Sequence, residues 1–132
     1  MHKDYKKLRK QITLAFIELR KQGFIAKQDW ACCTNCGFAD ILDEINEKYL
    51  DRLDKLKGFV FFHCQSLEIL KETGEAWLAW GVVKEDATDE CFLIAGKNIV
   101  AILKKFNMRV IWDGKISTKI CVVLKNNSSI IK

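Results

Sequence analysis

Hydrophobic residues recur every three or four positions near the N-terminus, which is typical of an amphipathic helix. Gly23 follows this stripe as a stop signal. The residues on the stripe are Leu8, Ile12, Ala15, Phe16 and Leu19. The pattern predicts a helix over about residues 4–22. A second and longer stripe begins at Phe38 and predicts a helix over about 36–56, with acidic and basic residues on its other face.

Short runs of β-branched and aromatic residues predict strands in the rest of the chain. The run "GFVFFHCQ" predicts a strand over 58–64, and "EAWLAWGVV" predicts an antiparallel partner over 76–83 after the turn-like "KETGE". A brief strand is expected in "GFIAKQDW", and helical spacing returns over about 95–106. The last two runs, in "MRVIWDGKISTKICVVLK", predict a hairpin turning at Asp113-Gly114.

This order of elements predicts an α+β fold. We expect a single-domain two-layer sandwich, in which about three helices cover one face of a mostly antiparallel sheet of four to five strands. The 132 residues suit one globular domain over 1–132. Residues 1–3 and 126–132 are expected to fray.

Composition and charge exclude several classes of protein. The net charge of +5 resides in the first 22 residues, where seven lysines or arginines face two acids. A single basic helix without a groove-reading motif does not predict nucleic-acid binding. No apolar run reaches the roughly 20 residues that span a bilayer, and the N-terminus lacks the apolar region of a signal peptide. We therefore expect a cytoplasmic protein without a membrane partner.

Three cysteines and a glycine gather in "QDWACCTNCGFAD", just before the second predicted helix. Cys33 and Cys36 have the Cys-x-x-Cys spacing that lets two thiolates meet on one zinc ion, and His63 is a candidate third ligand. Alternatively, the helix N-terminus lowers the thiol pKa and makes the pair redox-active. The third interpretation, which we favour, is a packed strand-to-helix corner with no cofactor.

The candidate binding residues lie further along the chain. His63 precedes Gln65 and Glu68 in "FFHCQSLE". Its interpretations are a base, a donor that orients a ligand, or a strand-end histidine without a functional role. Trp77 and Trp80 fall on opposite faces of one predicted strand, so one of them should be nearer solvent and available to anchor a ligand. No catalytic motif is found, and the chain is not expected to be an enzyme.

The segments "GFIAKQDWACCTNCGFADI", "GFVFFHCQSLE", "AWLAWG", "IVAILKKFNMRVIWDG" and "KICVVL" resemble a family of small bacterial proteins of unknown function. That family is marked by a Cys-Cys-x-x-Cys-Gly opening and a later His-x-Gln stretch, which Cys32, Cys33, Gly37, His63 and Gln65 match here. The resemblance covers roughly residues 20–125 and implies no particular activity. Ser66 stands where the family pattern has an acidic residue.

Two functional hypotheses follow from the sequence. The first is a small binding or regulatory protein, with a protein or small-molecule partner, whose surface lies near the cysteine turn and His63. Immunity and inhibitor proteins belong to this class, because they occlude a toxin by shape and charge without catalytic residues. The second is a zinc- or thiol-dependent protein centred on Cys33, Cys36 and His63.

Overall fold

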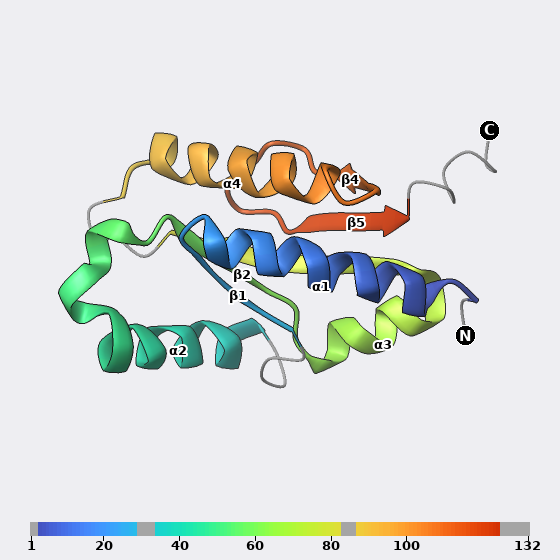
Figure 1. The fold of residues 1–132 in the computed structure, drawn as a ribbon, viewed down its shortest axis with the longest axis horizontal. Coiled ribbons are helices and arrows are strands. Elements are labelled where there is room, and N and C mark those ends of the chain that lie inside the picture. Colours follow the sequence, from blue (N-terminus) through green and yellow to red (C-terminus); the bar gives the residue numbers. More distant parts are fainter. Residues whose placement is uncertain (1–2, 29–33, 83–86, 125–132) are drawn as a thin grey trace.

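The computed structural model of the chain describes residues 3–28, 34–82 and 87–124. The predicted fraying of 1–3 and 126–132 falls, apart from residue 3, outside these ranges. Four α-helices and five strands occur in the described residues, together with a π-helical and a 3₁₀ segment (Figure 1). Their order is α1 (Tyr5–Lys21), β1 (Phe24–Lys27), α2 (Thr34–Glu44), η1 (Ile45–Tyr49), η2 (Leu50–Lys55), β2 (Gly58–Phe61), α3 (Cys64–Thr73), β3 (Glu75–Gly81), α4 (Asp89–Lys104), β4 (Met108–Ile111) and β5 (Ile120–Leu124).

The strands form one mixed sheet in the order β1-β2-β3-β5-β4. Only β1 and β2 pair in parallel, with Phe24 opposite Gly58, and the remaining pairs are antiparallel. A parallel pair needs a crossover connection, and α2, η1 and η2 supply it. The protein is thus an α+β fold with a five-stranded sheet, as the sequence predicts.

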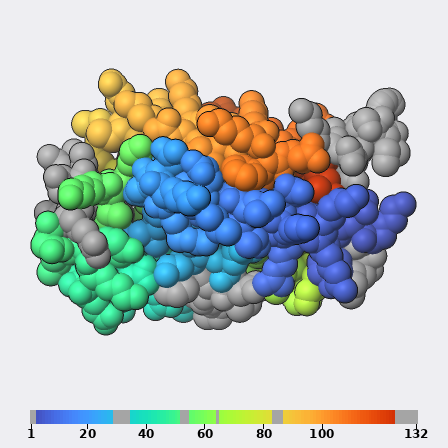
Figure 2. All heavy atoms as spheres, in the orientation of Figure 1, coloured from blue at the N-terminus to red at the C-terminus, as the bar shows by residue number. Residues whose placement is uncertain are grey.

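Helices α1, α3 and α4 cover one face of the sheet. Figure 1 shows α1 lying over the strands with α4 and α3 on either side of it, and Figure 2 shows α1 and α4 in contact along this face. Alternate residues of β3, Ala76, Leu78 and Trp80, point into this core. The largest helix residues buried there are Leu8, Ile12, Phe16, Leu19, Leu70, Ile99 and Leu103.

Helix α2 packs on the opposite face, over β1, β2 and β3. Ile41 joins a second cluster with Phe59 and Phe61, which alternate with the residues of the first core. The ring of Phe38 meets both of these phenylalanines edge-on, with centroids 5.5 Å apart in each pair. Gly37 lies directly against the Phe61 ring, which leaves no room for a Cβ at this position.

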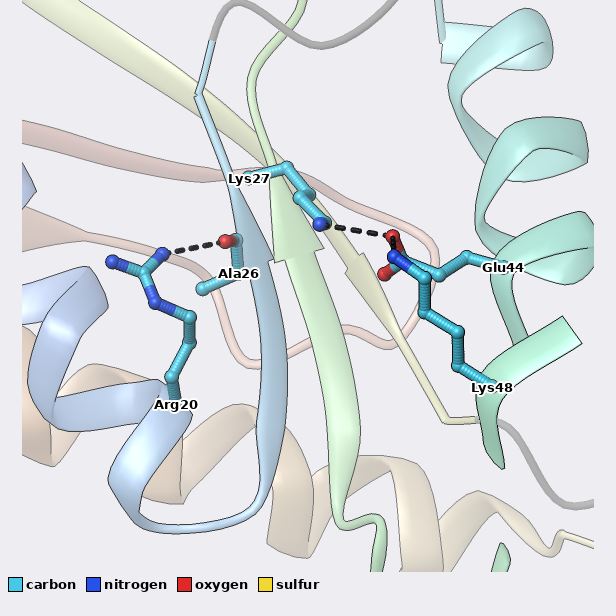
Figure 3. Close-up of polar contacts among 5 residues, drawn as sticks. All are labelled: Arg20, Ala26, Lys27, Glu44 and Lys48. Carbon is cyan, nitrogen blue, oxygen red and sulfur yellow. Dashed lines mark hydrogen bonds and ion pairs between the residues drawn. The ribbon is translucent and has the colours of Figure 1, made fainter. Parts of the chain in front are cut away.

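Polar side chains tie the edge strand β1 to the helices beside it (Figure 3). The Arg20 guanidinium on α1 donates to the Ala26 carbonyl at 2.8 Å. On the other side, Lys27 Nζ lies 3.0 Å from the largely buried Glu44 carboxylate of α2, and Lys48 Nζ lies 3.6 Å from the same oxygen. The Arg20 contact occupies one carbonyl of an edge strand whose backbone groups would otherwise be open to pairing with another strand.

Several sequence predictions need correction. The predicted helix over 36–56 is α2 followed by the π-helical and 3₁₀ segments. The helix expected at 95–106 begins earlier, at Asp89. Its start is capped by the Thr88 hydroxyl, which accepts a hydrogen bond from the backbone N–H of Cys91. Helix α3 was not predicted, so the estimate of about three helices is too low. The helices do not all cover one face, because α2 lies on the other. The final hairpin has a long loop between β4 and β5 rather than a tight turn.

No helix within the described ranges combines the length and the apolar character needed to cross a bilayer.

Replacing Gly37 with alanine tests the contact between α2 and the sheet. Helix propensity alone favours alanine by about 1 kcal/mol, whereas overlap with the Phe61 ring is expected to reverse the sign and destabilise the fold by about 1–3 kcal/mol. Denaturant unfolding measures the difference. The double variant Gly37→Ala with Phe61→Leu should recover part of the loss, and a Gly37→Ala protein that is more stable than wild type would show that the contact is loose.

Candidate functional site

A cavity of about 510 Å³ opens beside the N-terminus of α3. We call it the His63 pocket. Three of the residues that the sequence singles out, His63, Gln65 and Trp77, line it together. The complete lining among the described residues is Asn35, His63, Gln65, Ser66, Ile69, Trp77 and Lys119. Its volume lies within the range of about 300–1,000 Å³ that small-molecule sites occupy.

Four separate segments build the pocket. Asn35 comes from the first turn of α2, immediately after the cysteine-rich segment, and Trp77 comes from β3. Lys119 directly precedes β5, which pairs with β3 so that Trp77 lies opposite Cys121. Trp77 therefore lies on the second face of the sheet, and it lines the same cavity as the residues at the start of α3.

His63 is the N-cap of α3. Its Nδ1 accepts a hydrogen bond from the backbone N–H of Ser66 at 3.3 Å, and its Nε2 lies 3.4 Å from the Ser66 hydroxyl oxygen. Both residues are buried, with exposed fractions of 6% for His63 and 1% for Ser66. The histidine thus fills the place that serine or aspartate usually takes at a helix start.

This geometry fixes the protonation state of the ring. An Nδ1 that accepts from a backbone N–H carries no proton, so the single proton of the neutral ring sits on Nε2. Burial, and secondarily the positive charge of Lys119, hold the pKa of His63 below its usual value. In this tautomer Nε2 is the donor toward the Ser66 hydroxyl oxygen, so the contacts of His63 with Ser66 are those of a helix cap.

The pocket combines hydrogen-bonding side chains with one positive charge. Lys119 is the only charged residue among the described lining residues. The Trp77 indole and the amides of Asn35 and Gln65 add further N–H groups. Trp77 is 37% exposed, whereas Ile69 supplies an apolar wall. The arrangement suits a ligand with a negatively charged or acceptor group beside an apolar part.

The other predicted binding residues, Trp80 and Glu68, do not line this pocket. Trp80 is 7% exposed and faces the first core, where it packs edge-on against Phe92 and Trp112, and its indole N–H donates to the Thr118 carbonyl at 2.9 Å. The Glu68 side chain is 73% exposed and lies 3.8 Å from Lys71. Of the predicted tryptophan pair, Trp77 is therefore the one near solvent. Asn35, Ser66, Ile69 and Lys119 were not predicted, and no local sequence pattern marks Asn35 or Lys119.

Of the three predicted metal ligands, only Cys36 and His63 lie within the described residues. Cys33 lies outside the described ranges, as do Cys32 and Trp30. Cys36 is exposed on α2, and both nitrogens of His63 contact Ser66. Within the part of the chain that the structure describes, no group of three or more histidine, cysteine or acidic side chains is placed to hold a metal ion. Cys121 is buried, and this burial, with the Glu75 carboxylate nearby, raises the pKa of its thiol to about 12.

The cap makes stability depend on pH. Because the pKa of folded His63 is lowered, the unfolded chain binds a proton more readily, and stability is lost as pH falls through the unfolded pKa of about 6.5. Asparagine is a good N-cap that does not titrate in this range. We expect the free energy of unfolding to drop more between pH 8 and pH 5 in wild type than in His63→Asn. Equal slopes in the two proteins would contradict the assigned protonation state.

Comparison with known proteins gives a family but no precedent for the site. No curated protein and no solved structure matches the chain. A family model described as a domain of unknown function, DUF6891, matches residues 3–126. That range contains every described residue of the His63 pocket. The chain therefore belongs to the DUF6891 family, whose function is not known.

Proposed function

We propose that this chain is a binding protein that holds its partner or ligand at the His63 pocket. One observation supports the proposal above the others: residues from α2, α3, β3 and the segment before β5 converge on one concave site with a lysine and an exposed tryptophan. Exposed tryptophans beside a pocket are typical anchors of binding energy. The engagement of His63 in the helix cap argues against general-base catalysis at this position.

This proposal includes the regulatory and inhibitor-like roles that the sequence suggests. A protein partner would contact the pocket with a projecting side chain, and a small molecule would fill it. The zinc-dependent alternative has less support, because His63 uses both ring nitrogens within α3. A thiol-dependent role would have to rest on the cysteine-rich segment, since Cys121 is buried with a raised pKa.

A fragment screen tests the binding function directly. Isotope-labelled protein is exposed to a chemically diverse library while NMR follows the indole N–H of Trp77 and the backbone amide of Gln65. We expect hits to shift these two signals together, and Trp77→Ala to weaken them by about tenfold or more, as for loss of an aromatic anchor. Ile111→Ala is the matched control, because Ile111 is an exposed apolar residue of the sheet that does not line the pocket. Hits that bind Trp77→Ala as well as wild type would refute the proposal.

The metal alternative has its own measurement. Elemental analysis of protein purified without a histidine tag is expected to give the same zinc content for wild type and for His63→Asn, because the imidazole nitrogens are occupied by Ser66. A loss of zinc confined to the variant would make His63 a ligand.

A further inference from the structure

A second cavity, of about 440 Å³, shares Lys119 with the His63 pocket. Most of its lining is apolar, whereas the His63 pocket is lined mainly by polar side chains. The residues that line it are Phe38, Phe59, Ala79, Trp80, Gly81, Val82, Phe92, Ile116, Ser117, Thr118 and Lys119. We infer that the two cavities form one groove that binds a small amphipathic carboxylate, with its charged group at Lys119 and its apolar body in the second cavity. This inference rests on the proposed binding function.

The backbone places the two cavities in line. Trp77, Ala79 and Gly81 alternate along β3, so all three lie on the second face of the sheet. Asn35 and Phe38 are three residues apart on α2, which puts them on the same side of that helix. Asn35 and Trp77 line the polar cavity. Phe38, Ala79 and Gly81 line the apolar cavity.

Gly81 lets the Phe59 ring pack directly against the backbone of β3 at the apolar end. A Cβ at this position would lie 2.7 Å from the Phe59 ring, which is its cross-strand neighbour. The space above the strand is therefore bounded by aromatic rings and a bare backbone. The aromatic part of this surface favours an apolar chain over a polar group, because the rings of Phe38, Phe59 and Phe92 cannot replace hydrogen bonds to water.

The wall formed by the loop between β4 and β5 is held in place by hydrogen bonds. The Trp80 indole N–H donates to the Thr118 carbonyl at 2.9 Å, and the Thr118 hydroxyl donates to Asp113 Oδ1 at 2.6 Å. The backbone N–H of Lys115 donates to the same carboxylate oxygen at 3.0 Å. A wall fixed before the ligand arrives lowers the entropic cost of binding, so the groove is preorganised for one shape of ligand.

The charge of the groove selects the ligand class. Lys119 is the only ionisable side chain, other than the neutral His63, among the described residues that line either cavity. A carboxylate beside it gains a charge-assisted hydrogen bond, whereas an ammonium group meets a like charge. Each cavity has the volume of a small-molecule site, which favours a small carboxylate with a hydrocarbon body over a flat protein surface.

Three probes of equal chain length separate charge from apolar contact. Octanoate, 1-octanol and octylammonium are titrated into labelled protein, and NMR follows the indole N–H of Trp77 and the ring signals of Phe38. We expect octanoate to bind about tenfold or more tightly than octanol, octylammonium to bind more weakly than both, and both residues to respond to octanoate.

Matched variants assign the effect to particular residues. Lys119→Met should reduce octanoate affinity to that of octanol and leave octanol unchanged. Lys97→Met removes the same charge from an exposed lysine of α4 that lines neither cavity, and it should leave both affinities unchanged. Phe38→Ala, at a partly exposed ring, should weaken octanoate and octanol alike.

The outcomes distinguish this inference from the proposed function. Equal affinity for all three probes, with shifts at Trp77, would overturn the carboxylate preference and leave the binding function intact. Octanoate that shifts Trp77 but not Phe38 would overturn the joined groove. Failure of every octyl probe, while fragments of other chemistry still shift Trp77 and Gln65, would also refute the inference, and failure of both experiments would remove the proposed function as well.

Discussion

Strand β2 must be covered on both of its faces, and the rest of the architecture depends on this requirement. All four of its residues are buried, with Val60 turned toward α1 and Phe59 and Phe61 turned toward α2. The chain meets the requirement by carrying α2 across the second face within the crossover that joins β1 to β2. Gly37 makes the approach close enough for the phenylalanine rings to pack, so a single missing side chain sets how the helix sits on the sheet.

Helix α2 covers only part of the second face, and the candidate site is a consequence. On the remaining part, Trp77 and Ile111 stay exposed while Cys121 lies buried between their strands. The border between the covered and uncovered parts runs along β3. Residues of α2 and of the segment before β5 line the cavities at this border. A groove at such a border has a rigid floor from the sheet and walls from two independent segments, which is a common situation for ligand sites.

The sequence predicts the parts of this fold that have strong local patterns. The stripe of α1 and the aromatic runs of β2 and β3 are of this kind, and the alternation in β3 correctly separates Trp77 from Trp80. Helix α3 was not predicted because it is short, has few inward-facing residues and directly follows a β-rich run. Its one clear marker in the sequence is Gly74, which ends the helix with a positive φ of 76°. His63 and Gln65 were found because they are neighbours in the chain. Asn35 and Lys119 were not, because only the tertiary fold brings residues so far apart in sequence to one pocket.

The mixed sheet also implies an order of assembly. Strands β4 and β5 are joined by one loop, whereas β1 finds its partner only after the chain has passed through α2, which makes that pairing a long-range closure with a larger entropic cost. We expect the β1–α2–β2 unit to dock last and to open first in native-state fluctuations. Helix α2 forms one wall of the groove. A ligand bound there would therefore slow hydrogen exchange throughout the β1–α2–β2 unit, although it contacts only one side of α2.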